Sequence, residues 1–121
     1  MRRVFKSFFY ALRGIWFTLR SERNFQIECA VGGAVFLLLL WLPMSSIERA
    51  LLLFAVGSVL GLELVNTALE RVMDILKPRV HPYARVIKDV MAGAVLIVSF
   101  TALLMGILIF SPYFFQGFHF Y

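Results

Sequence analysis

Apolar and polar residues follow one another along this chain in four helical blocks. The first, about residues 4–20, has apolar residues at helical spacing on one face and basic or polar residues on the other. The apolar stripe is Val4, Phe8, Leu12, Ile15 and Leu19, and the opposite face holds Arg3, Lys6, Tyr10, Arg13 and Arg20. A basic face opposite a Phe-rich face is typical of a helix lying in a membrane interface, although an ordinary helix packed in a bundle also fits.

Three apolar blocks follow, and each is long enough to cross a membrane. They cover about residues 25–42, 50–70 and 90–111, and the last contains 22 residues without a charge. Short polar segments separate them: residues 21–24, which we expect to cap the next helix, a turn over residues 43–49, and a loop over residues 77–88. Pro112 is expected to end the third span. The pattern therefore predicts an all-α integral membrane protein with three transmembrane helices and an N-terminal amphipathic surface helix.

Composition supports a membrane protein and the charges give its orientation. The chain has 121 residues, of which 61% are hydrophobic and 16% charged, so we expect one membrane domain over residues 1–121. Its net charge is +5, with six basic residues before Asn24 and five from Arg71 to Lys88. Because positive residues favour the cytoplasm, we place the N-terminus and the 71–88 loop there and the C-terminus outside. This placement explains the net positive charge of the chain without a nucleic-acid partner.

The second span carries polar residues that form one stripe. Glu63, Asn66, Thr67, Glu70 and Asp74 are spaced by three or four residues and so share a helix face. Carboxylates in a membrane helix are costly and are functional candidates by default. The alternative is that they snorkel or pair at the helix end. Clustered carboxylates require a proton or a divalent cation if they are to lie close together.

Other acidic residues fall at the same end of the spans. They are Glu22, Glu28 and Asp89, and Lys88 stands beside the last. Carboxylates for a metal and a lysine for phosphate suit a nucleotide–Mg²⁺ site at the membrane surface. The sequence contains no P-loop and no glycine-rich kinase loop. The residues alone therefore leave a second hypothesis open, a non-enzymatic small cation channel or transporter subunit.

Two motifs carry a family resemblance. The pattern Glu63-x-x-Asn66-Thr67-Ala68-x-Glu70-x-x-x-Asp74, followed by Lys88-Asp89-x-x-Ala92-Gly93-Ala94-Val95, resembles the prokaryotic diacylglycerol kinase family, which includes undecaprenol kinases. The segment from Glu22 to Phe25 and the three-span layout also match, so the resemblance covers nearly the whole chain. It implies a homotrimer in the cell (inner) membrane that transfers the γ-phosphate of ATP to a lipid alcohol with Mg²⁺, at active sites shared between subunits.

The resemblance also implies roles for individual residues. Glu63 is similar to the family's general base, and Asn66 to the residue that orients base and phosphate. Glu22 and Glu70 resemble metal ligands, and Glu28 matches a substrate-side position. Lys88 and Asp89 resemble nucleotide-binding residues, which Tyr10 and Gly14 match more loosely. Asp74 fits a nucleotide contact or a structural cap equally well. Glu28 is typical of diacylglycerol kinases, whereas the Ala92–Val95 motif leans to undecaprenol kinases, so the residues leave the lipid open.

Overall fold

The computed structural model describes residues 1–76 and 82–116, and the described residues form four helices. They are α1 (Arg2–Ser21), α2 (Arg23–Trp41), α3 (Ser46–Leu76) and α4 (Tyr83–Gln116). Helices α2, α3 and α4 are long and apolar enough to cross a membrane. Their placement in sequence agrees with the three predicted spans.

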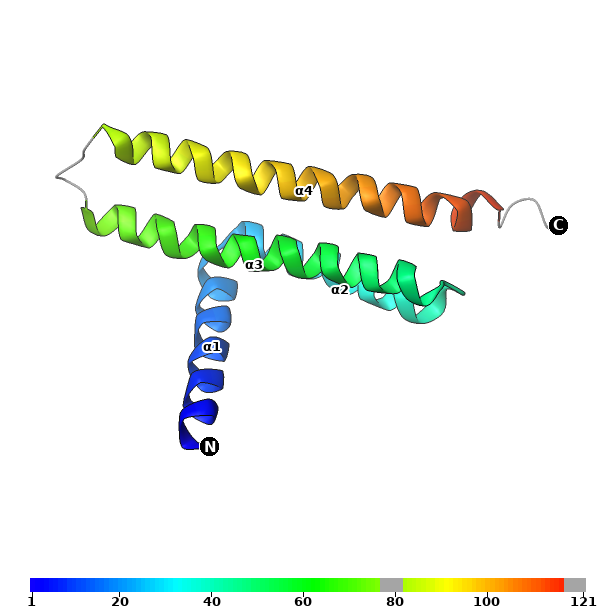
Figure 1. The fold of residues 1–121 in the computed structure, drawn as a ribbon, viewed down its shortest axis with the longest axis horizontal. Helices are drawn as coiled ribbons and strands as arrows, with labels where there is room; N and C mark the ends of the chain where they lie inside the picture. Colours follow the sequence, from blue (N-terminus) through cyan, green and yellow to red (C-terminus); the bar gives the residue numbers. More distant parts are fainter. Residues whose placement is uncertain (77–81, 117–121) are drawn as a thin grey trace.

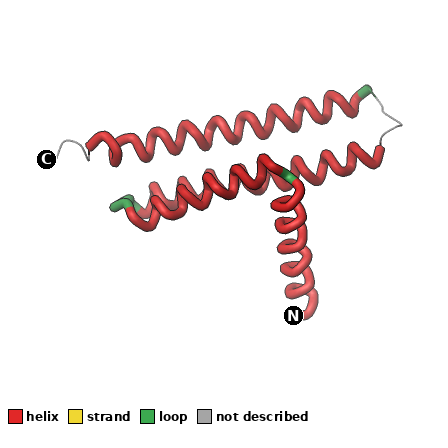
Figure 2. Tube along the Cα trace, turned by 180° about the vertical axis from the view of Figure 1, so that it is seen from behind, coloured by secondary structure: helices red, strands yellow, loops and turns green. Residues whose placement is uncertain are grey.

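The three spanning helices form a layered bundle from which α1 departs. Helices α2 and α4 each pack against α3, but within the described residues they do not pack against each other (Figure 1). Helix α1 leaves the side of the bundle and carries the N-terminus away from it (Figure 2). We call the end where α3 stops and α4 starts the carboxylate end, because α3 carries its acidic stripe toward it. The opposite end holds the start of α3 and the end of α4.

The break between α1 and α2 is shorter than predicted. Glu22 alone is non-helical, with φ −114° and ψ 115°, and it offers no side-chain cap to α2. The expected side-chain cap over residues 21–24 is therefore wrong, because Glu22 is the N-cap of α2 and its carboxylate bonds to Arg71 instead. The last carbonyls of α1 are satisfied separately. The backbone N–H of Glu22 donates to the Thr18 carbonyl at 2.8 Å, and the Gln26 amide donates to the Leu19 carbonyl at 2.8 Å.

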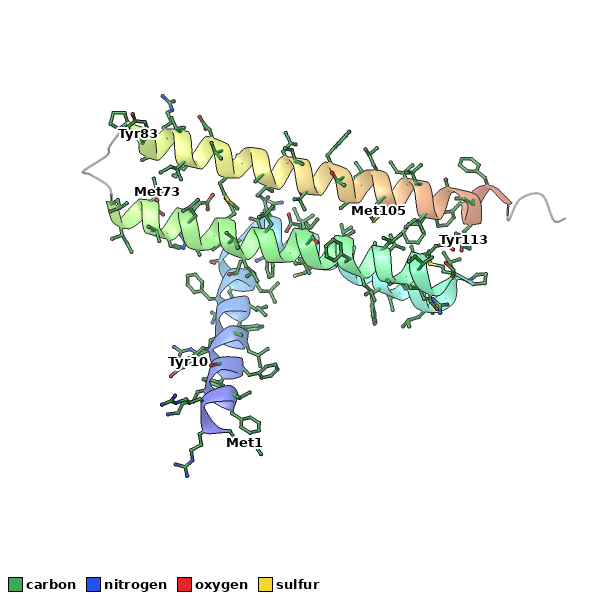
Figure 3. All side chains as sticks on the ribbon, viewed as in Figure 1. Met1, Tyr10, Met73, Tyr83, Met105 and Tyr113 are labelled. Atoms are coloured by element: carbon green, nitrogen blue, oxygen red, sulfur yellow. The ribbon has the colours of Figure 1, made fainter. Side chains whose placement is uncertain are left out.

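A polar clip fastens the opposite end of the bundle. Ser45 and Glu48 form a capping box: the Glu48 N–H donates to Ser45 Oγ at 3.2 Å, and the Ser45 N–H donates to Glu48 Oε1 at 3.2 Å. Tyr113, near the end of α4, donates its hydroxyl to the same carboxylate at 2.8 Å (Figure 3). We call these three residues the Glu48 clip. It joins the start of α3 to the last turns of α4.

The described helices extend beyond two predicted boundaries. Residues 83–88 of the predicted 77–88 loop are helical, because Pro82 precedes the first residue of α4, where a fixed φ favours a helix start. Pro112 lies inside α4 and does not end it. Its missing N–H removes one hydrogen bond from a helix that has only four more residues to run. Residues 77–81 of the predicted loop lie outside the described residues.

The bundle buries few apolar side chains. Its core at the opposite end consists of Leu39, Met44 and Leu52, against which Phe110 and Tyr113 pack. Large residues elsewhere are open, among them Phe54 and Leu108, each 73% exposed. A soluble domain could not leave so much apolar surface in water, whereas lipid or neighbouring copies of the chain would cover it.

Candidate active site

Glu63 is the most deeply buried charged side chain that the structure describes. Its exposed fraction is 3%, and Thr67, one turn further along α3, is equally buried. Glu63 lies within electrostatic range of three other carboxylates, those of Glu22, Glu28 and Glu70. These four residues form what we call the carboxylate cluster. They come from α2, α3 and the α1–α2 junction, so helix packing brings together side chains that are up to 48 positions apart.

Asn66 lies beside the buried carboxylate. Its side-chain amide hydrogen-bonds to Glu63, with an amide N–H as the donor and a carboxylate oxygen as the acceptor. The motif spacing of three residues places the two side chains on one helix face. The structure therefore places Asn66 next to Glu63, and its role in orienting the base stays a prediction.

Two polar atoms near this region lack partners within the described chain. They are Glu28 Oε2 and Thr67 Oγ1, both buried and without a hydrogen bond. Buried polar atoms are nearly always satisfied in native proteins, and leaving one unpaired costs about 1–3 kcal/mol. These atoms are therefore candidates for contact with a bound molecule, and Glu28 was predicted to face the substrate.

Arg71 forms an ion pair with one member of the cluster, Glu22, where α1, α2 and α3 meet. Its guanidinium lies 3.1 Å from Glu22 Oε1 and 3.8 Å from Asp74, and it stacks over the Phe17 ring at 5.6 Å from the ring centroid. The Glu22 side chain is 23% exposed. Arg71 thus fixes the orientation of a predicted metal ligand and ties the end of α1 to α3.

None of the predicted nucleotide-binding residues belongs to the carboxylate cluster in the described part of the chain. Lys88 and Asp89 are exposed near the start of α4, at the carboxylate end, and among residues 1–76 and 82–116 neither forms an ion pair with the cluster. Asp74 is also exposed and contacts Arg71. Tyr10 lies on the part of α1 that points away from the bundle (Figure 3). Gly14 lies one turn nearer the bundle, and its carbonyl accepts a hydrogen bond from Thr18 at 2.9 Å.

The donor set of the cluster suits Mg²⁺. No group of three or more Asp, Glu, His or Cys side chains in the described part of the chain has the spacing to hold a metal. Mg²⁺ does not need such a cage, since it commonly takes one or two carboxylates and completes its shell with water and substrate phosphates. The carboxylates of Glu22 and Glu70, hard oxygen ligands that flank Glu63, meet this requirement.

Comparison with known proteins decides the family. The model of the family "Prokaryotic diacylglycerol kinase" matches residues 9–110. The chain belongs to this family of lipid kinases. The matched region contains every predicted site residue, from Tyr10 to Asp89.

Individual relatives in this kinase family agree with the assignment. An undecaprenol kinase of Bacillus subtilis is 41% identical over 112 residues, which cover 93% of this chain and 91% of the relative. A diacylglycerol kinase of Synechocystis is 38% identical over 83% of this chain, but the match spans 58% of that longer protein. The diacylglycerol kinase of Escherichia coli K12 is 28% identical over 84% of each chain.

Sequence reasoning did not identify Arg71 as a site residue of the kinase. It was counted only among the basic residues that set the orientation. Its position next to Glu70 gave a local signal, but its partners Glu22 and Phe17 are 49 and 54 positions away. Contacts of that separation depend on how the helices pack.

We predict that Arg71→Met loosens the α1–α2 junction. The methionine keeps part of the apolar stem but loses the ion pair and the ring contact, each worth about 0.5–1 kcal/mol at a partly exposed site. A loss of about 1 kcal/mol would speed amide hydrogen exchange about fivefold at residues 18–24. Arg23→Met is the matched control, because Arg23 is exposed and forms no ion pair within the described residues. Equal exchange in the two variants would contradict the tethering role.

Proposed function

We propose that this chain is an ATP- and Mg²⁺-dependent kinase that phosphorylates a membrane lipid alcohol at the cytoplasmic face of the inner membrane. The observation that carries the proposal is the burial of Glu63 among three further carboxylates, beside a hydrogen-bonding Asn66. Family membership supports the chemistry, and it favours this reading over the cation channel or transporter subunit that the residues alone left open.

Glu63 is proposed to act as the general base. It takes the proton of the lipid hydroxyl as the hydroxyl oxygen attacks the γ-phosphorus of ATP. The new bond joins that oxygen to phosphorus, and the bond to the bridging β–γ oxygen breaks, so that ADP leaves. Asn66 keeps the Glu63 carboxylate oriented toward the lipid hydroxyl during this step. The buried position shields the base from water, which would otherwise compete as acceptor of the phosphoryl group.

The remaining residues supply charge and position, which phosphoryl transfer needs more than covalent chemistry. Glu22 and Glu70 would hold Mg²⁺, and Arg71 keeps Glu22 in place. When bound, the metal supplies positive charge that offsets the charge of the phosphate oxygens. Lys88 would pair with phosphate, while Asp89, Asp74, Tyr10 and Gly14 would position the nucleotide. Glu28 would accept a hydrogen bond from the lipid.

The orientation follows from charge. We place the N-terminus and the carboxylate end in the cytoplasm, because eleven of the twelve basic residues lie before Asn24 or between Arg71 and Lys88. ATP is cytoplasmic, so the acidic stripe and the nucleotide meet on the same side. Helix α1 departs from the bundle close to Glu22, as a helix lying in the membrane interface would (Figure 1).

A homotrimer is proposed for the assembly. The described chain leaves Tyr10 away from the cluster, and it exposes long apolar faces on α3 and α4. Gly57 and Gly61 form a small-residue pair on α3, and no neighbouring atom would meet a Cβ at either position. Small residues of this spacing let membrane helices of adjoining subunits approach closely. A neighbouring copy would then complete the nucleotide site.

The lipid is proposed to be undecaprenol. The relative with 41% identity is an undecaprenol kinase, whereas the diacylglycerol kinases of Synechocystis and Escherichia coli are 38% and 28% identical. We expect purified protein with radiolabelled ATP and Mg²⁺ to give a higher kcat/KM with undecaprenol than with diacylglycerol or ceramide in the same micelles. Glu63→Gln provides the background rate. A strong preference for diacylglycerol would overturn the lipid assignment, and phosphorylation of no lipid would refute the kinase proposal.

Substitution of single carboxylates should separate the base from the metal ligands. Glu63→Gln keeps size but cannot take the proton, so turnover should fall by about 10²-fold or more while ATP–Mg²⁺ affinity stays near wild type. Glu70→Gln and Glu22→Gln should instead raise the Mg²⁺ concentration needed, and added Mg²⁺ should restore part of the rate. Glu48→Gln makes the same change at the opposite end and should keep the wild-type Mg²⁺ dependence. If Mg²⁺ rescued Glu63→Gln but not Glu70→Gln, the two roles would have to be exchanged.

A further inference from the structure

Thr67 carries a hydroxyl group to which the proposed reaction assigns no role. Its side chain is as deeply buried as that of Glu63, and its Oγ1 atom forms no hydrogen bond within the described residues. A threonine in a helix often bonds the carbonyl of the residue four positions earlier, as Thr18 bonds Gly14 at 2.9 Å. Thr67 forms no such bond, so its hydroxyl is free to bind a group outside the backbone of α3.

Two pairs of neighbours show which part of the bundle lies opposite Thr67. Glu22 pairs with Arg71 at 3.1 Å, and Glu28 lies within electrostatic range of Glu63. Residue numbers therefore rise along α2 while those of the partners fall along α3, which means that the two helices run antiparallel. Thr67 is midway between the two partners on α3, so it faces the first turns of α2.

The Thr67 hydroxyl also lies on the side of the carboxylate cluster. Side chains of an α-helix point back toward its N-terminus, so Thr67 covers the turn that begins at Glu63, about 6 Å away along the helix axis. On α2, Glu28 Oε2 is a second buried side-chain oxygen without a hydrogen bond in the described chain. One hydroxyl that can donate and two carboxylates that can accept thus gather where α2 packs on α3.

We propose that Thr67, Glu28 and Glu63 share one buried water molecule. The water accepts the hydrogen bond that Thr67 donates, and it donates one hydrogen to Glu28 Oε2 and the other to the Glu63 carboxylate. A direct bond between the two unpaired oxygens is excluded, because neither has a protein partner within hydrogen-bond distance. A single water with three partners, the usual number for a buried water, satisfies both of them.

Thr67 is on this basis a positioning residue for the base. The water holds the Glu63 carboxylate from the α2 side, while Asn66 hydrogen-bonds to it from α3. It also links Glu63 to Glu28, so these two like charges keep a fixed separation although they repel each other. An ionised carboxylate accepts up to about four hydrogen bonds, which leaves both glutamates able to bind the lipid hydroxyl. Only this positioning role rests on the proposed function, since the water site does not depend on the reaction.

A crystal structure that shows ordered water tests the site without any turnover. Wild-type protein should have a water within about 3 Å of Thr67 Oγ1, Glu28 Oε2 and one Glu63 oxygen. Thr67→Val has the same shape without the hydroxyl and should lose this water. A wild-type structure without the water would overturn the proposal, even if Thr67→Val failed to fold. So would a water that Thr67→Val retains, or an ion about 2.1 Å from the carboxylates, which is the distance typical of Mg²⁺.

Turnover of undecaprenol tests whether the water positions the base. Thr67→Val should lower kcat about tenfold, since a misplaced reacting group costs up to about 10²-fold, and the KM for ATP should not change. Thr67→Ser keeps the hydroxyl and should restore most of the rate. Thr101→Val is the matched control, because Thr101 is exposed on α4 and outside the cluster.

Two kinetic outcomes would contradict the positioning role of Thr67. If its hydroxyl had no partner, Thr67→Val would leave kcat unchanged and raise the melting temperature, because an unpaired buried group would have been removed. Equal losses in Thr67→Val and Thr67→Ser would indicate that Thr67 matters only for packing. If wild-type protein phosphorylated no lipid, the proposed function would fail, whereas the crystallographic result would still decide whether the water is there.

Discussion

A carboxylate buried in an apolar helix is the constraint on which the rest of this molecule depends. Glu63 is 3% exposed and sits on a helix that is long and apolar enough to cross a membrane. An ionised group in such surroundings costs several kcal/mol unless it is paired and hydrogen-bonded. Glu63 lies near the middle of α3, and the chain offsets part of this cost with Asn66 as a hydrogen-bond donor.

The neighbours of Glu63 add to the cost of its negative charge, and the proposed divalent cation would offset that cost. Glu22, Glu28 and Glu70 add negative charge at close range, and within the described residues Arg71 is the only cation that pairs with any of the four. A divalent cation would bind such a cluster more tightly than isolated carboxylates, because each carboxylate that it neutralises also relieves repulsion among the others. The same excess charge favours a neutral lipid alcohol over anionic lipids. In the proposed function, electrostatics would link metal binding and lipid choice at one site.

Much of this organisation was predictable because it is local. Spacing of three and four residues placed Glu63, Asn66 and Glu70 on one face, and apolar length gave three spans that the helices α2, α3 and α4 match. The predicted breaks were less accurate, because a proline or a capping residue indicates where a helix can end and not where it does. Pro112 lies within α4, and the predicted 21–24 break consists of Glu22 alone.

The Ser45–Glu48 capping box could have been predicted from the sequence and was missed. Its bond to Tyr113, 65 positions from Glu48, depends on helix packing. The apolar pocket that Glu28 lines is formed by residues of α2, α3 and α4, so it too depends on helix packing.

The central claim is that the carboxylate cluster holds the divalent cation of a nucleotide. Mn²⁺ reports on this directly, because it replaces Mg²⁺ at oxygen ligands and its electron paramagnetic resonance signal distinguishes free from bound ion. With a non-hydrolysable ATP analogue, wild-type protein in detergent should bind Mn²⁺, and Glu63→Gln should bind it equally well. Glu22→Gln and Glu70→Gln should each weaken binding about tenfold or more, since even outer contacts of metal sites are worth that much. Unchanged Mn²⁺ affinity in both variants would contradict the account.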